Sequence, residues 1–352
     1  MKKFLLLMAM GLLAASAYAD VKVEVKGFAT DTVIVQRINL QGNRRVAADS
    51  VVVVKDGAFA LPNVAKPMCM YIGPKDRTVR PATLYINPGE NFEVTLTKGE
   101  NPIVKGSAVQ DMINEVLNRQ SDIIDKTKDV DDATRDSLYA EYKKVPENYA
   151  RENLNSPITL WALSRCGYEV IDELLPQIGE NARKSMFGEL EEALVKRVEK
   201  EKAIAEAQKL TAEGMPAPDF SLNHPDGSAF VMQSMRGMWV VLDFWGSWCS
   251  WCIKGMPEMK KSYEKYGDKM EIVSIACGDS KESWLAAIKK YDMNWTNVIS
   301  ADVVPGTDKK VEQIYGITGY PTKIIVNPQG KIVKRFVGET PLFYEALEEL
   351  IK

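Results

Sequence analysis

Two cysteines separated by two residues, Cys249 and Cys252, are the side chains of this chain best suited to covalent chemistry. They follow an apolar segment, Val240 to Trp245, that is typical of a strand, and they open a segment (250–266) with the pattern of a helix. Unpaired amides and a partial positive charge at a helix N-terminus favour thiolate, so the pKa of Cys249 should fall below the free value of about 8.5. Cys249 would then attack a disulfide, and Cys252 would resolve the mixed disulfide by thiolate exchange.

The same spacing is also half of a zinc site, or it could hold a purely structural disulfide. Zinc takes about four ligands. Further ligands are scarce in this chain, because it has five cysteines, one histidine (His224) and no second C-x-x-C or C-x-x-H motif. We therefore expect no metal and no cofactor, and a redox-active Cys249–Cys252 disulfide as the reactive group.

A C-terminal domain, residues 211–352, must position this pair. It starts where Gly214, Pro216 and Pro218 break a helical pattern. Strand and helix patterns then alternate, and an Asn327-Pro328-Gln329-Gly330 turn precedes the last strand. This order predicts a central mixed sheet flanked by helices. The expected strands are 230–232, 239–245, 272–276, 323–326 and 332–336, and the expected helices are 250–266, 281–291, 308–315 and 342–351.

Two regions precede that domain. Residues 20–106 predict a small all-β domain, a sandwich or barrel, with strands at 33–35, 51–54, 59–61, 84–86 and 92–96. Its turn signals are Gly42-Asn43, Asp56-Gly57 and Asn87-Pro88-Gly89, of which Asp56-Gly57 is a strong hairpin signal. Residues 107–210 are rich in helix formers and predict several helices punctuated by Pro146, Pro157 and Pro176.

Residues 1–19 predict a signal peptide. Lys2 and Lys3 precede an apolar run, Phe4 to Ala15, and Ala17-Tyr18-Ala19 offers small residues for cleavage after Ala19. An uncleaved anchor is the alternative. Export would place the chain in the periplasm, where disulfides persist.

The other three cysteines and the net charge give further expectations. We expect Cys277, Cys69 and Cys166 to be buried free thiols, and the alternative for Cys69 and Cys166 is a disulfide with each other. The net charge of −3 argues against a nucleic-acid partner.

Several motifs, in the right order, resemble the TlpA/ResA branch of the thioredoxin-like superfamily. They are Pro216-Ala217-Pro218-Asp219-Phe220, Leu242-Asp243-Phe244-Trp245-Gly246-Ser247-Trp248-Cys249 and Gly319-Tyr320-Pro321-Thr322. Pro257, five residues after Cys252, matches a proline of the first helix in this family. More weakly, residues 21–106 resemble a β-rich domain of unknown role that precedes such domains in secreted Bacteroidetes proteins.

The resemblance implies roles for further residues. Pro321 matches a cis-proline that would leave the backbone of Tyr320 free to pair with substrate, although an ordinary turn proline is the alternative. Asp243 matches a buried acid that would relay a proton to or from Cys252, although a structural Asp is the alternative. The implied substrate-binding residues are Trp248, Ser250, Trp251, Tyr320 and Thr322, and packing alone would also explain the tryptophans.

One position departs from the pattern. Several members of this branch carry a Glu three residues after the second cysteine, and this chain has Gly255 there. Glu258 we expect to be a solvated helix residue. The departure puts in doubt any specialised role tuned by that acid, such as cytochrome c maturation.

We expect a periplasmic disulfide reductase that acts on protein disulfides or thiols. A membrane thiol protein would supply its electrons, and a homodimer is possible. Two alternatives remain. A binding module could carry an accessory redox domain. A peroxiredoxin is disfavoured, because that chemistry wants Thr or Ser where Gly246 stands.

Overall fold

The computed structural model describes residues 21–27, 32–40, 50–61, 64–74 and 79–351. These residues form two compact units, with the boundary between Val198 and Glu199. The predicted leader and the predicted turn at Gly42-Asn43 lie outside the described residues. Within the described ranges, no helix combines the length and the apolar character needed to cross a bilayer.

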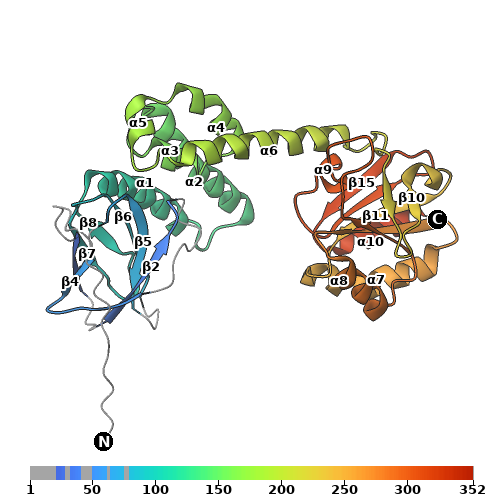
Figure 1. Cartoon of the computed structure of the whole chain (residues 1–352), viewed down its shortest axis with the longest axis horizontal. Coiled ribbons are helices and arrows are strands. Elements are labelled where there is room, and N and C mark those ends of the chain that lie inside the picture. Colours follow the sequence, from blue (N-terminus) through green and yellow to red (C-terminus); the bar gives the residue numbers. More distant parts are fainter. Residues whose placement is uncertain (1–20, 28–31, 41–49, 62–63, 75–78, 352) are drawn as a thin grey trace, which may run out of the picture. The chain divides into compact units, whose positions relative to one another are not determined.

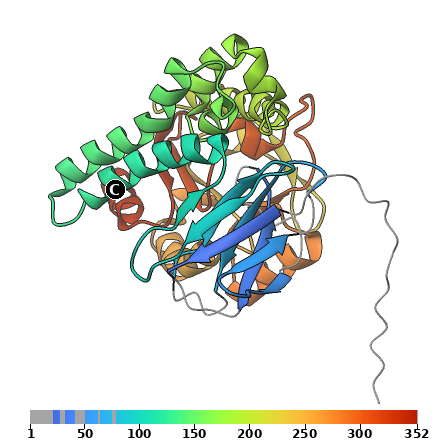
Figure 2. The same ribbon diagram turned by 90° about the vertical axis from the view of Figure 1, so that its left-hand side faces the viewer.

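The first unit contains two four-stranded sheets packed as a sandwich (Figures 1 and 2), as predicted. In the first strand, buried Val21, Val23 and Val25 alternate with exposed residues, the pattern of a strand with one face on a core. One sheet has the order β4-β1-β7-β8 and the other β3-β2-β5-β6. The strands are β1 (Val21–Lys26), β2 (Thr32–Ile38), β3 (Ser50–Val53), β4 (Ala58–Leu61), β5 (Met68–Gly73), β6 (Ala82–Ile86), β7 (Phe92–Thr95) and β8 (Ile103–Lys105).

The turn at Asp56-Gly57 forms, but it does not make the predicted hairpin. Asp56 and Gly57 both have positive φ, 50° and 77°, and Lys55 and Ala58 exchange two backbone hydrogen bonds of 2.9 Å. Beyond that turn the strands separate, because β3 pairs with β2 and β4 pairs with β1. The turn therefore carries the chain from one sheet to the other.

Helices complete the first unit, and Pro146 does not divide them as predicted, because it lies inside α2. Proline cannot donate to the carbonyl four residues earlier. That carbonyl, of Tyr142, instead accepts a hydrogen bond of 3.2 Å from Nε2 of Gln120 on the neighbouring helix. The helices are α1 (Ala108–Asp125), α2 (Asp132–Glu152), α3 (Thr159–Leu163), α4 (Tyr168–Leu174), α5 (Glu180–Lys184) and α6 (Leu190–Leu210), which extends into the second unit.

A second core joins these helices to the sandwich, and it holds Cys69 and Cys166. Both are buried free thiols, as expected. Burial raises the pKa of each thiol to about 12, so neither forms a thiolate at neutral pH.

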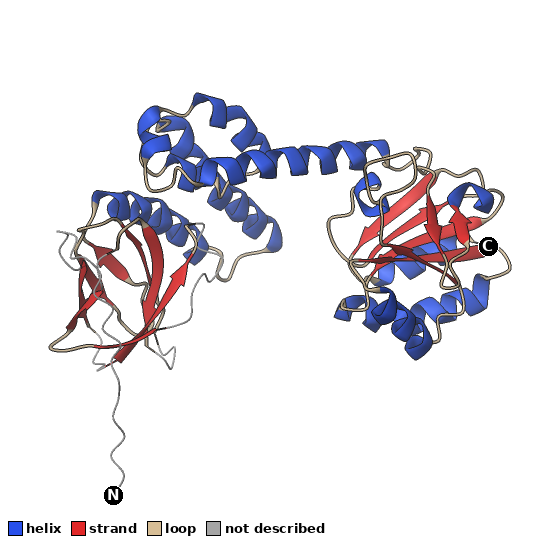
Figure 3. Ribbon diagram, viewed as in Figure 1, coloured by secondary structure: helices blue, strands red, loops and turns tan. Residues whose placement is uncertain are grey.

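The second unit is a seven-stranded mixed sheet with helices on both faces (Figure 3), as predicted. Its order is β10-β9-β13-β12-β11-β14-β15. The strands are β9 (Ser221–Asn223), β10 (Ala229–Val231), β11 (Trp239–Trp245), β12 (Met270–Cys277), β13 (Thr296–Ser300), β14 (Thr322–Val326) and β15 (Ile332–Val337). The helices are α7 (Ser250–Tyr266), α8 (Lys281–Tyr291), α9 (Val311–Ile314) and α10 (Pro341–Leu350).

Strand β11 lies inside this sheet, parallel to β12 and antiparallel to β14. Its residues Val241 and Trp245 contribute to the core formed with α7, α8 and α10. Leu242 and Phe244 contribute to the core on the opposite face. Because strand side chains alternate, Asp243 shares the face of Val241 and Trp245, the one covered by the helix that starts at the cysteines.

Candidate redox site

The cysteine pair lies where β11 ends and α7 begins. Cys249 is the N-cap of α7, and its Sγ accepts a hydrogen bond of 3.2 Å from the amide of Cys252. The two cysteines form a disulfide across Cα atoms 5.3 Å apart. After reduction, the same amide and the positive end of the helix would stabilise a thiolate on Cys249.

Asp279, which the sequence reasoning missed, anchors the turn before the pair. Its carboxylate accepts hydrogen bonds from the Ser247 amide (2.8 Å) and the Ser247 hydroxyl. The indole Nε1 of Trp248 adds a bond of 3.0 Å to the carbonyl of Cys277. Asp279 lies two residues after the end of β12, and this position beside the end of β11 was the available signal.

Substituting Asp279 with alanine should loosen this turn. We expect a loss of about 1–2 kcal/mol in the free energy of unfolding, because two hydrogen bonds to a carboxylate are lost. We also expect a lower rate of thiol–disulfide exchange, because the turn that positions Cys249 is less well held. Denaturant unfolding and a disulfide-reduction assay would measure both. Glu348→Ala removes an exposed ion pair with Lys265 and should leave the free energy of unfolding nearly unchanged. Equal losses in the two variants would contradict an anchoring role for Asp279.

The residues that flank the cysteines are exposed. Trp248 and Trp251 expose 57% and 60% of their surface, so packing alone does not explain them. The ring of Trp248 meets that of Tyr320 edge to face at 5.3 Å, and Lys254 lies over Trp251. Ser250, between them, is exposed as well.

The Tyr320–Pro321 peptide bond is cis, and it lies beside the pair. The next residue, Thr322, pairs with Phe244 near the end of β11, and Tyr320 packs against the core that contains both cysteines. Thr322 itself is fully buried, and its hydroxyl donates to the carbonyl of Gly319 at 2.7 Å. Its side chain supports the turn rather than facing the surface.

Asp243 is 2% exposed beneath α7. Its Oδ2 accepts a hydrogen bond of 2.9 Å from the hydroxyl of Ser274, which accepts one of 2.9 Å from Nε1 of Trp295. Burial raises the pKa of Asp243, while nearby Lys323 and the bond from Ser274 act in the opposite direction. A carboxyl of this kind can hold a proton at a higher pH than an exposed Asp can.

Next to Asp243 lies a buried ion pair that the sequence reasoning also missed. Lys323 Nζ is 2.5 Å from Oε2 of Glu339, with 3% and 15% of the two side chains exposed. The hydroxyl of Tyr344 donates to Oε1 of the same carboxylate at 2.6 Å. A lysine in the apolar strand Thr322–Val326 was the signal for such a pair, because a buried charge needs a partner.

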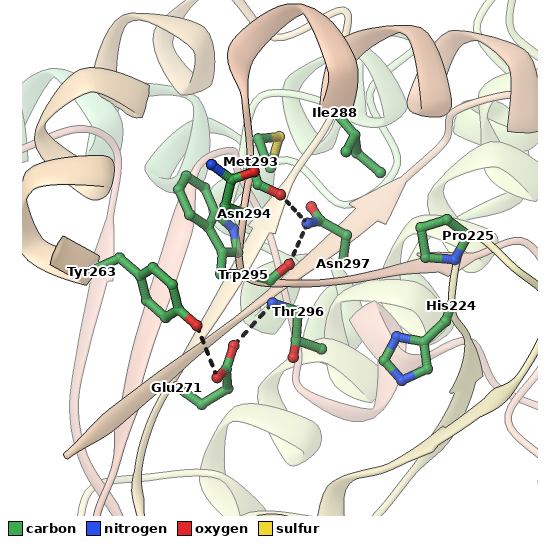
Figure 4. A pocket seen from close by; sticks show the side chains of 10 residues that line it. All are labelled: His224, Pro225, Tyr263, Glu271, Ile288, Met293, Asn294, Trp295, Thr296 and Asn297. Atoms are coloured by element: carbon green, nitrogen blue, oxygen red, sulfur yellow. Dashed lines mark hydrogen bonds between the residues drawn. The ribbon is translucent and has the colours of Figure 1, made fainter. Parts of the chain in front are cut away.

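Hollows open on this unit, and two of them differ in the residues that line them. One, of about 650 Å³, borders the redox site and is lined in part by Trp251, Gly255, Glu339 and Tyr344. The other, of about 480 Å³, is lined in part by half-buried His224 (Figure 4). In it Glu271 accepts bonds from Thr296 and Tyr263, while Oδ1 of Asn297 has no hydrogen-bond partner in the described structure. None of the residues predicted for the redox site lines this second hollow.

A mixed sheet with a C-x-x-C disulfide at a helix N-terminus and a cis-proline beside it defines a thioredoxin-like redox domain. Residues 214–335 match the model of the AhpC/TSA family. Thiol-disulfide oxidoreductase ResA of Bacillus subtilis is 33% identical over 137 residues, covering 39% of this chain and 73% of that protein. Thioredoxin-like protein YneN of the same organism is 33% identical over 130 residues, covering 36% and 72%.

The chain therefore belongs to the ResA-like thiol–disulfide oxidoreductases, and it is an enzyme of that class. Among solved structures, it is similar to the thioredoxin domain of a thiol–disulfide oxidoreductase from Bacteroides vulgatus. The identity is 28%, the coverage is 40% of this chain and 99% of that one, and the TM-score is 0.36. Residues 20–113 match a domain of unknown function, DUF4369.

Proposed function

We propose that this oxidoreductase is a disulfide reductase that acts through Cys249 and Cys252. The observation that carries the proposal is the position of Cys249 as the N-cap of α7, with its sulfur accepting the Cys252 amide. This placement makes Cys249 the better thiolate of the two and hence the attacking group.

The proposed reaction transfers two electrons from the dithiol to a substrate disulfide. The Cys249 thiolate attacks one substrate sulfur, the substrate S–S bond breaks, and the other substrate sulfur leaves as a thiolate that takes a proton from water. The Cys252 thiol then gives its proton to the Asp243 carboxylate and attacks Sγ of Cys249. The mixed disulfide breaks, the second substrate thiolate leaves, and the Cys249–Cys252 disulfide remains.

A membrane thiol protein is the electron donor that we propose. The bacterial periplasm is kept oxidising, so a reductase there needs electrons from a source outside that compartment. The leader pattern of residues 1–19 supports export. N-terminal sequencing of the mature protein should find Asp20 first, and an intact Met1 in the exported fraction would contradict cleavage.

The reduction potential of the Cys249–Cys252 pair tests the direction of electron flow. A reductase should equilibrate in thiol–disulfide buffers nearer to about −270 mV than to about −120 mV, the values of thioredoxin and of the oxidant DsbA. A reduction potential near about −120 mV would instead indicate that the protein forms disulfides in its substrates. If the Cys249–Cys252 pair shows no reversible redox couple, the reductase proposal is wrong and the binding-module alternative takes its place.

A further inference from the structure

The pairing of Lys323 is unexpected, because a second carboxyl is close to it. Lys323 and Asp243 are register partners on adjacent strands, so their side chains project from the same face of the sheet. Among the described ion pairs, however, Lys323 is joined to Glu339 and not to Asp243. The hydrogen bond that the structure records for the Asp243 carboxyl comes from the neutral hydroxyl of Ser274.

Helix α7 leaves room for this arrangement at Gly255. A Cβ atom on that residue would lie 2.3 Å from Oε2 and 2.6 Å from Cδ of Glu339, closer than atoms can approach. The carboxylate therefore lies against the helix that carries both cysteines. Tyr344 also holds this carboxylate, since its hydroxyl donates to Oε1 and lies 3.4 Å from the carbonyl of Gly255.

We propose that Glu339 is a positioning residue of the redox site, which holds Lys323 in an ion pair and so leaves Asp243 without a direct ion-pair partner and able to exchange a proton with Cys252. The role given to Asp243 rests on the proposed function. Glu339 would act on the chemistry through Lys323 and Asp243, without touching a reacting sulfur.

The charges around Asp243 give the direction of the effect. The Glu339 carboxylate helps burial to raise the pKa of Asp243, and the Lys323 ammonium lowers it. Removing the charge of Glu339 deletes one raising influence and frees Lys323 to approach Asp243, so both changes lower the pKa. The titratable or charged groups that interact with Asp243 are Lys323, Glu339, Tyr344 and Cys277. Cys249 and Cys252 belong to the core on the same face of the sheet.

The first test needs no turnover. The carboxyl carbon of Asp243 can be titrated by ¹³C NMR in the full-length oxidised protein and assigned by its absence in Asp243→Asn. In Glu339→Gln the midpoint should move to lower pH by about one unit. Glu348→Gln removes the charge of an exposed residue of α10 and should leave the midpoint in place. An unchanged or higher midpoint in Glu339→Gln would overturn the proposal.

The second test follows the resolving step in the reduced enzyme. The rate at which Cys252 releases a preformed mixed disulfide should rise with pH as Asp243 loses its proton. The acid limb of this profile should move to lower pH in Glu339→Gln. It should be absent in Asp243→Asn, whether or not Glu339→Gln is also present, because the titrating carboxyl is gone. A merely structural role for Glu339 would change the amplitude of the profile without moving its limb.

A second variant covers the case in which Glu339→Gln does not fold. Gly255→Ala keeps every charge but pushes the Glu339 carboxylate aside, and it should move the Asp243 midpoint in the same direction. The two ideas fail separately. If the midpoint stays in place while the wild type reduces disulfides, only the role of Glu339 is wrong; if the wild type has no reversible couple, the proposed function is wrong.

Discussion

The Cys249→Ala variant is expected to lose catalysed disulfide reduction by more than about 100-fold, because the attacking sulfur is gone. Cys252 should not replace it, because the helix N-terminal amide that would stabilise a thiolate is directed at the sulfur of Cys249 and not at that of Cys252. The assay is reduction of a model protein disulfide by the reduced enzyme under single-turnover conditions, with thiol release measured over time.

The control for this variant is Cys277→Ala. Cys277 is a buried thiol, and burial raises its pKa, so it should contribute no nucleophile at neutral pH. Its loss should leave the rate within about twofold, provided that the variant folds as judged by circular dichroism. Substantial activity in Cys249→Ala would move the attacking role to another residue.

In the Cys252→Ala variant, attack should still occur but the mixed disulfide should persist. The first step needs the Cys249 thiolate alone, whereas release of the substrate needs a second thiolate within reach. We expect a one-to-one covalent adduct with a disulfide substrate, visible as a mass increase in non-reducing gels and abolished by dithiothreitol.

The double variant Cys249→Ala/Cys252→Ala shows whether the adduct forms at the N-cap sulfur. It keeps Cys69, Cys166 and Cys277, so any adduct that remained would have to arise at one of these buried thiols. Failure of Cys252→Ala to accumulate any adduct, under conditions where the wild type reduces the substrate, would contradict the two-step exchange.

Most of the redox site could be predicted because it is local in the sequence. Cys249 and Cys252 lie within one helical turn, and the apolar strand before them and the helix after them are strongly patterned. The predicted helix 250–266 coincides with α7, and 281–291 with α8. The predicted strand 239–245 coincides with β11, which delivers the pair to the end of the sheet.

Elements with weak local patterns were missed. β13 (Thr296–Ser300) contains two polar residues, Asn297 and Ser300, that are buried by pairing with β12 and by nearby side chains. β5 (Met68–Gly73) lacks the alternation of a half-buried strand, because it packs between β2 and β6 and is buried on most of its length. In both cases the neighbours, and not the segment, stabilise the strand.

The class of this protein could thus be predicted from short motifs, whose spacing along the chain sets the distance between the two candidate cysteines. The side chains that surround these cysteines could not be predicted, because they come from segments that are far apart in the sequence. Strand register brings Lys323 beside Asp243, the segment between β15 and α10 brings Glu339 to Lys323, and Gly255 makes room for Glu339. A charge buried in a fold interacts with whatever the packing brings near it, and no local pattern records that distance.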